Sequence, residues 1–173
     1  MAASTPAAAA EATRREMIAG ALAVGRTHGD RSAVRAMVRA EQVLVATYEQ
    51  LLAAGAFTHT AERVAHEFLG HERAHVAALR AELGRASAPR SPRGLGSVAT
   101  LDTRQAVELL VGVERAALSV YYTELARIRA PSLAKTAAVI MANEAQHASV
   151  LLELVAPGDV GRAVPAAFVD GTR

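Results

Sequence analysis

The sequence of 173 residues contains no cysteine and no tryptophan, and it has only three phenylalanines and three tyrosines. Without cysteine, the chain cannot form disulfides, zinc–thiolate sites or iron–sulfur clusters, and it cannot carry a rubredoxin-type electron-transfer module. Lysine is nearly absent as well, because Lys135 is the only one and arginine supplies the remaining positive charge. No basic run with interleaved aromatic residues occurs, so we expect no nucleic-acid binding.

Long apolar runs are also missing. Although 51% of the residues are hydrophobic, no stretch is long and apolar enough to span a membrane. Near the N-terminus, Arg14 and Arg15 precede a short apolar run that ends at Arg26, and no convincing Ala-x-Ala cleavage site follows. We therefore favour a cytoplasmic protein, with export by a degenerate twin-arginine signal as the alternative.

The apolar residues that are present are mostly alanine, leucine and valine, which recur at helical spacing. They predict one soluble all-α domain that is large enough for a hydrophobic core. Gly55 and Gly84 are expected to end helices. The predicted helices run from Asp30 or Ser32 to about residue 54, from the cap Thr60 to about 83, from the cap Asp102 or Thr103 to about 129, and from Pro131 to about 155.

Prolines and glycines make residues 85–101 the one substantial linker. The other two connections are short, which forces the helices on either side to be antiparallel neighbours. The sequence therefore predicts an antiparallel four-helix bundle of two helical hairpins joined by one long crossover. Residues 30–155 would form this bundle, residues 1–29 an N-terminal arm that is disordered or a short helix, and residues 156–173 an extended C-terminal tail.

One pattern of metal-ligating residue types occurs twice. In each copy a Glu lies on an apolar helix, a Tyr follows seven residues later, and a Glu-x-x-His pair begins about 30 residues after the first Glu. The first copy is Glu41, Tyr48, Glu72 and His75, and the second is Glu114, Tyr121, Glu144 and His147. Because residues three apart on a helix share a face, each Glu-x-x-His pair can point into one cavity.

Four carboxylates and two imidazoles suit a pair of hard or borderline metal ions such as iron or manganese. Apolar residues flank Glu41 and Glu114, which argues against solvated positions. Carboxylates gathered in one core would repel one another unless cations neutralised them. We therefore predict a di-metal site. Tyr48 and Tyr121 would be redox-active, would donate a hydrogen bond to a ligand, or would simply pack near the core.

Over residues 30–155 the chain resembles bacterial ferritin-like proteins of the di-iron carboxylate superfamily, on the strength of these six ligand types and their spacing. The resemblance implies that Glu41 and Glu114 are terminal ligands, that Glu72 and Glu144 bridge the two metals, and that each His binds one metal. It also implies two iron ions, or manganese or a mixed pair, and redox chemistry with dioxygen or peroxide such as Fe²⁺ oxidation. The chain lacks the cysteine module of rubrerythrins and any recognisable nucleation carboxylates of storage ferritins. We expect a monomer or homodimer rather than a cage.

Two alternatives stay open at this point. A ferritin-like bundle could bind metal, or serve a structural role, without catalysis. In addition, His71 to His75 spells the HExxH motif of zinc hydrolases, in which His71 and His75 would hold zinc and Glu72 would act as general base. That interpretation needs a third ligand and usually an edge strand. It also leaves the second Glu-x-x-His pair unexplained, because Asn143 stands where the first His would be.

Overall fold

Four long helices carry the fold. The computed structural model describes residues 6–83 and 98–163, with side chains described from residue 29 onward, and no strand occurs in these ranges. The helices are α1 (Pro6–Ala53), α2 (His59–Leu83), α3 (Thr103–Leu125) and α4 (Pro131–Val155), followed by the short α5 (Val160–Ala163). The predicted all-α four-helix bundle is confirmed.

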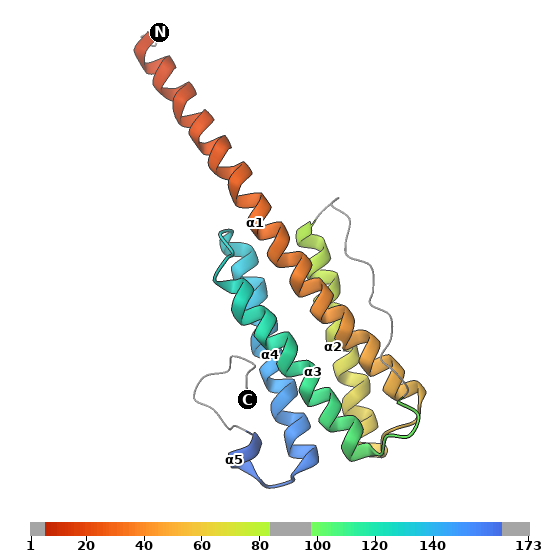
Figure 1. The fold of residues 1–173 in the computed structure, drawn as a ribbon. Coiled ribbons are helices and arrows are strands. Elements are labelled where there is room, and N and C mark those ends of the chain that lie inside the picture. The colour runs from red at the N-terminus through yellow and green to blue at the C-terminus, as the bar shows by residue number, and fades with distance from the viewer. Residues whose placement is uncertain (1–5, 84–97, 164–173) are drawn as a thin grey trace.

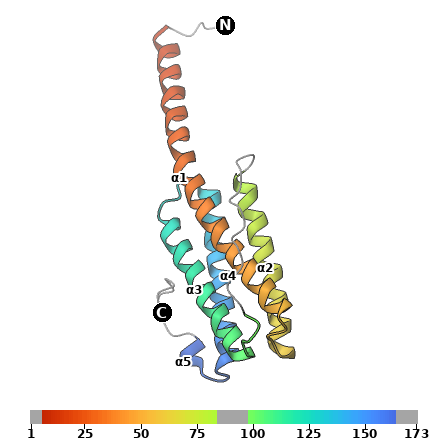
Figure 2. The same cartoon turned by 45° about the vertical axis from the view of Figure 1, so that its right-hand side comes forward.

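The helices pair as two antiparallel hairpins, α1 with α2 and α3 with α4 (Figure 1). The hairpins meet where α1 packs against α3 and α2 against α4. Because α2 ends and α3 begins at opposite ends of the bundle, the two hairpins are joined by one long crossover. Figure 2 shows the four helices side by side, with the N-terminal part of α1 projecting beyond them.

Two clusters of buried apolar residues fill the bundle, one above the other along its axis. One cluster lies toward the α1–α2 turn and includes Leu51, Phe68 and Leu110, and the other lies toward the α3–α4 turn and includes Met37 and Leu79. Each fully buried side chain of this size stabilises the fold by about 1.5–3 kcal/mol. On α1, α2 and α4 the predicted ligands fall between the two clusters, and on α3 Glu114 lies within the first cluster, near the start of the second, so the core positions the ligands at mid-height.

The start of α1 differs from the prediction. The helix does not begin at Asp30 or Ser32 but runs without a break from Pro6. Asp30 is buried within it, and its carboxylate accepts hydrogen bonds from the backbone N–H groups of Arg129 (2.7 Å) and Ala130 (3.2 Å). These groups lie at the turn into α4. Asp30, the expected cap of α1, therefore stabilises the start of α4 instead.

Other helix ends agree with the sequence signals. Gly55 follows α1 with φ +65°, in the left-handed region that glycine adopts most easily. The side chain of Asp102 accepts a hydrogen bond from the backbone N–H of Gln105, whose side chain bonds back to the Asp102 N–H, so α3 begins with a capping box. Pro131 occupies the first turn of α4, where its missing N–H costs nothing.

Three boundaries are corrected by the structure. α2 begins at His59, before the predicted cap Thr60, and α3 ends at Leu125 rather than near residue 129. The region expected to be an extended tail contains α5. Its turn is held by Asp159, whose carboxylate accepts a hydrogen bond from the Arg162 N–H at 3.0 Å.

Two predictions fall outside the described residues. They are the linker at 85–101, apart from its last four residues, and the side chains of the twin-arginine-like segment around residues 14–15. Among the helices that the structure does describe, none combines the length and the hydropathy needed to cross a membrane.

Candidate metal centre

A cluster of buried carboxylates and imidazoles lies at mid-bundle, and every long helix contributes to it. Its members are Glu41 from α1, Glu72 and His75 from α2, Glu114 from α3, and Glu144 and His147 from α4. All four glutamates are completely buried, and His147 is 1% exposed, whereas the side chain of His75 is 12% exposed. The structure thus brings together all six residues that the repeated pattern singled out.

The possible ligand atoms form two overlapping groups, and within each group they lie within 4.8 Å of one another. One group consists of Glu41, Glu72, His75 and Glu144, and the other of Glu72, Glu114, Glu144 and His147. Glu72 and Glu144 belong to both groups. Two adjacent positions therefore share a pair of carboxylates, and each has one further carboxylate and one imidazole of its own.

Both imidazoles turn their Nδ1 atoms toward the carboxylates. The Nδ1 of His75 lies 2.9 Å from Glu144 Oε1 and 3.3 Å from Glu41 Oε2. The Nδ1 of His147 lies 2.9 Å from Glu72 Oε1 and 3.8 Å from Glu144 Oε2. Each imidazole therefore makes its shortest contact with the carboxylate of the other Glu-x-x-His pair, which links α2 to α4 through the site.

The two tyrosines cross between the hairpins in the same way. The Tyr48 hydroxyl donates a 2.6 Å hydrogen bond to Glu114 Oε1, and the Tyr121 hydroxyl donates a 2.6 Å hydrogen bond to Glu41 Oε1. Neither tyrosine bonds the Glu seven residues before it on its own helix. Both phenols are fully buried, and burial raises the pKa of each hydroxyl above its ordinary value. They remain proton donors that fix one oxygen of each carboxylate.

Burial and mutual contact shift the protonation of the cluster. Burial raises the pKa of Glu41 to about 8 and the pKa of Glu144 to about 11. Burial alone would lower the pKa of His75 and His147, but the carboxylates outweigh it and raise the pKa values to about 12 and about 9. Burial also disfavours charge on Glu72, yet the two imidazoles lower its pKa to about 2. Without metal, the cluster therefore balances its charges with protons.

Several buried polar atoms in the cluster make no hydrogen bond of regular geometry in the described chain, although some lie within ion-pair distance of one another. They are both carboxylate oxygens of Glu72 and of Glu144, Oε2 of Glu114, and Nδ1 of His147. Unsatisfied buried polar atoms are rare in folded proteins, and here they belong to residues of the same small cluster. An oxygen-rich set with one nitrogen per position fits iron or manganese, so the donor atoms suit a pair of such ions.

Residues 8–157, which span all four long helices, match the model of one protein family, described as a ferritin-like domain. The chain belongs to this ferritin-like family. No curated protein and no solved structure matches the chain. The family match covers both hairpins and all six members of the cluster, so the bundle and the repeated residues are parts of one ferritin-like unit.

One residue of this ferritin-like site was not predicted from the sequence. His71 reaches across to α4, where its Nδ1 lies 2.9 Å from His147 Nε2, and it belongs to neither ligand group among the described residues. His71 and His75 therefore do not share the cluster that a zinc HExxH site needs, and the described residues contain no edge strand. The HExxH spelling marked the position of His71, but no sequence signal indicated a contact with His147.

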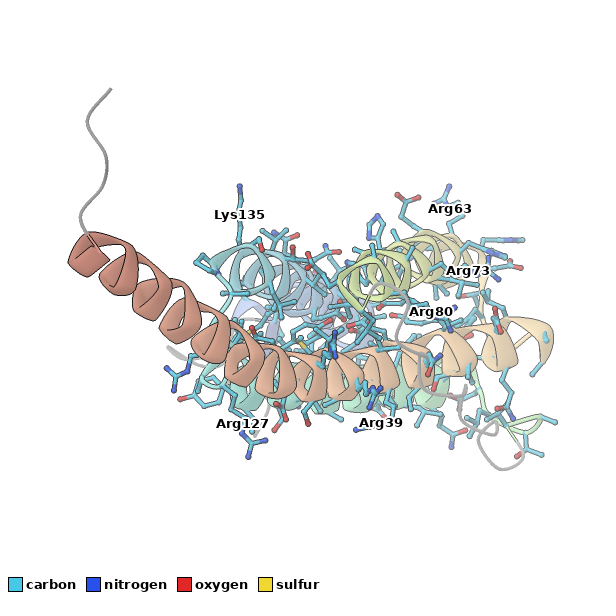
Figure 3. All side chains as sticks on the ribbon, turned by 90° about the horizontal axis from the view of Figure 1, so that it is seen from above. Arg39, Arg63, Arg73, Arg80, Arg127 and Lys135 are labelled. Atoms are coloured by element: carbon cyan, nitrogen blue, oxygen red, sulfur yellow. The ribbon has the colours of Figure 1, made fainter. Side chains whose placement is uncertain are left out.

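The arginine and lysine side chains that the structure describes make no ion pair with the four glutamates of the cluster. In Figure 3, Lys135 points to one side of the bundle, whereas Arg39 and Arg127 point to the opposite side. Arg73, the neighbour of a cluster residue, points outward and pairs with Glu49 at 2.8 Å. An exposed ion pair of this kind contributes about 0–1 kcal/mol, so Arg73 does not neutralise the buried carboxylates.

Proposed function

We propose that this ferritin-like protein binds two iron ions, or manganese or a mixed pair, and uses them to react with dioxygen or peroxide. Fe²⁺ oxidation is the simplest reaction of this class. The observation that carries the proposal is the overlap of the two ligand groups through Glu72 and Glu144. Two carboxylates common to both groups favour a bridged pair of ions over two independent sites.

In this proposal each residue of the cluster has one role. Glu72 and Glu144 would be shared by the two ions, Glu41 and His75 would hold one ion, and Glu114 and His147 would hold the other. When bound, the ions supply the electrons for reduction of the oxidant. The protein supplies the ligands and a fixed arrangement of them, with all four glutamates buried from bulk water.

The chain's own contribution is orientation and protection. Tyr48 and Tyr121 each hold one oxygen of a terminal carboxylate at 2.6 Å, which leaves the second oxygen to face the centre. Complete burial of the glutamates keeps water from competing with the ligands. The crossed contacts tie the two hairpins to each other, so the site holds its shape only in the folded bundle.

Elemental analysis of the purified protein, before and after anaerobic loading with Fe²⁺, tests the proposal. We expect about two ions per chain, one for each ligand group, and almost none in the Glu72→Gln/Glu144→Gln variant. The control is Glu62→Gln/Glu82→Gln, which changes two exposed carboxylates of α2, the helix that carries Glu72. Oxygen consumption after mixing with air then separates a catalytic protein from one that only binds metal.

Each outcome decides between the candidates. Two ions with oxidant consumption support a di-metal oxidoreductase, whereas two ions without turnover leave a non-catalytic ferritin-like metal-binding protein. Failure to bind any ion in the wild type overturns the proposal. Size-exclusion chromatography of the same samples tests the expected monomer or homodimer, because a species that small cannot enclose a mineral core.

A further inference from the structure

The two Glu-x-x-His segments supply the same candidate ligands, but the residue that precedes the Glu differs between them and makes different contacts. His71 precedes Glu72 as Asn143 precedes Glu144, so these residues occupy equivalent places on α2 and α4. His71 contacts a candidate ligand of the other helix. Asn143 instead donates a 3.4 Å hydrogen bond to Gln146 on its own helix. The site therefore departs from its own symmetry at one pair of positions.

We propose that His71 is a positioning residue that makes the His147 half of the site the tighter of the two metal positions. The inference rests on the proposed function, since it concerns how strongly each position holds its ion. It adds a residue outside both ligand groups and an order of filling that the ligand set alone does not give.

The geometry on the His147 side supports this role. His71 Nδ1 lies 2.9 Å from His147 Nε2, and the two ring planes are inclined by only 15°. A contact this short between nearly coplanar imidazoles has the geometry of a hydrogen bond in the plane of both rings. If Nδ1 of His147 gives its lone pair to a metal among the carboxylates, the ring proton has to lie on Nε2, from which it can be donated to His71 Nδ1.

Neighbouring groups fix this arrangement further. Phe68 stacks on the His147 ring with centroids 3.9 Å apart and planes inclined by 22°, so the ring cannot turn freely. On the far side of His71, Nε2 lies 3.5 Å from Glu67 Oε1, and this exposed carboxylate favours the tautomer of His71 that accepts at Nδ1. Histidine ligands whose second ring nitrogen is bonded in this way hold metals about 10–100-fold more tightly than those without such support.

The His75 half lacks these supports among the described residues. The polar contacts of His75 in the described chain are all made through Nδ1, with Glu144, Glu41 and Glu72, and its side chain is 12% exposed. No polar group of the described residues bonds its Nε2. We therefore expect the ion on the His75 side to bind second and to exchange more readily.

Calorimetric titration with Co²⁺, followed in parallel by visible absorption, tests the order of filling in the full chain. The wild type should bind two ions in two resolved steps. Glu114 belongs only to the His147 group and Glu41 only to the His75 group. Glu114→Gln should therefore remove the tight step, and Glu41→Gln should remove the weak one.

Substitutions at His71 and at the equivalent Asn143 then test whether His71 strengthens the tight step. His71→Leu, which removes the acceptor at a site with a 40% exposed side chain, should weaken the tight step by about tenfold or more and leave the weak step unchanged. His71→Asn should restore most of the affinity, because an Asn oxygen can take the position of the His Nδ1. The matched control Asn143→Leu should change neither step. Circular dichroism verifies that each variant is folded.

The outcomes keep the two proposals apart. Two steps of equal affinity, or a tight step that is insensitive to His71→Leu, would overturn this inference while the di-metal site stands. An equal effect of Asn143→Leu on the tight step would also overturn it. No binding of Co²⁺ by the wild type would remove the proposed function itself, and this inference with it.

Discussion

Replacing Glu41 by Gln should make the metal-free protein more stable at neutral pH, although it removes a candidate metal ligand. Glutamine has nearly the shape of a protonated glutamic acid and is neutral at every pH. Its amide oxygen can still accept the hydrogen bond that the Tyr121 hydroxyl donates to Glu41. The substitution therefore keeps the packing of the site and removes one ionisable group from a fully buried place.

The size of the effect follows from the pKa of Glu41, which burial raises from its ordinary 4.5 to about 8 in the folded protein. A raised pKa means that the folded state favours the protonated acid. The stability gained from that proton is complete below pH 4.5 and is lost as the pH rises toward 8. Between pH 4.5 and 7 the wild type should lose about 3 kcal/mol through this group, at 1.36 kcal/mol per pH unit. The glutamine variant does not share that loss.

Urea unfolding followed by circular dichroism, with a chelator present, measures this difference. The unfolding free energy of Glu41→Gln minus that of the wild type should grow by about 3 kcal/mol from pH 4.5 to pH 7. Glu49→Gln is the matched control, because Glu49 lies on the same helix with a half-exposed side chain. The reasoning is refuted if the difference for Glu41→Gln is independent of pH, or if the control shows the same slope.

Three further predictions concern the surroundings of the site. Tyr121→Phe should lower the unfolding free energy by about 1–3 kcal/mol in urea, because it leaves a buried carboxyl oxygen without its donor, and the exposed Tyr122→Phe should have almost no effect. Asp30→Ala should cost about 2 kcal/mol in the same assay through two lost backbone hydrogen bonds, and a change within about 0.5 kcal/mol would show that the turn does not need it. The apparent affinity for Co²⁺ should rise between pH 7 and pH 9, because a metal must displace the protons that raised pKa values retain on Glu41 (about 8) and His147 (about 9). Titration of the released protons checks this, and an affinity without pH dependence contradicts it.

The sequence predicts the bundle and the membership of the site because both depend on local spacing. A Glu-x-x-His pair shares a helix face whatever the helix packs against, and apolar flanks indicate that the face is buried. The contacts within the site could not be predicted in this way. Tyr48 bonds Glu114 across 66 positions and Tyr121 bonds Glu41 across 80, so each pairing depends on how the hairpins are rotated against each other.

The same physical limit explains the boundary errors. Asp30 has the sequence character of a helix cap, and its carboxylate does bind backbone N–H groups, but they belong to residues 129 and 130. A cap signal states what a side chain can accept and not which helix will offer the donors. His71 is similar, since its neighbours in the sequence suggested a zinc motif while its partner lies 76 residues away.

The buried cluster links the stability of the fold to the occupancy of the site. In the metal-free protein, protons on Glu41 and Glu144 offset the charge that burial disfavours. Those protons are released as the pH rises, so the empty fold weakens under the conditions in which its ligands bind metal best. An ion present at a hundredfold excess over its dissociation constant would stabilise the fold by about 2.7 kcal/mol. That gain is close to the loss of about 3 kcal/mol expected from Glu41 alone by pH 7. At neutral pH, a bound ion would therefore offset the stability that is lost when Glu41 ionises. Removal of the metal should accordingly lower the free energy of unfolding.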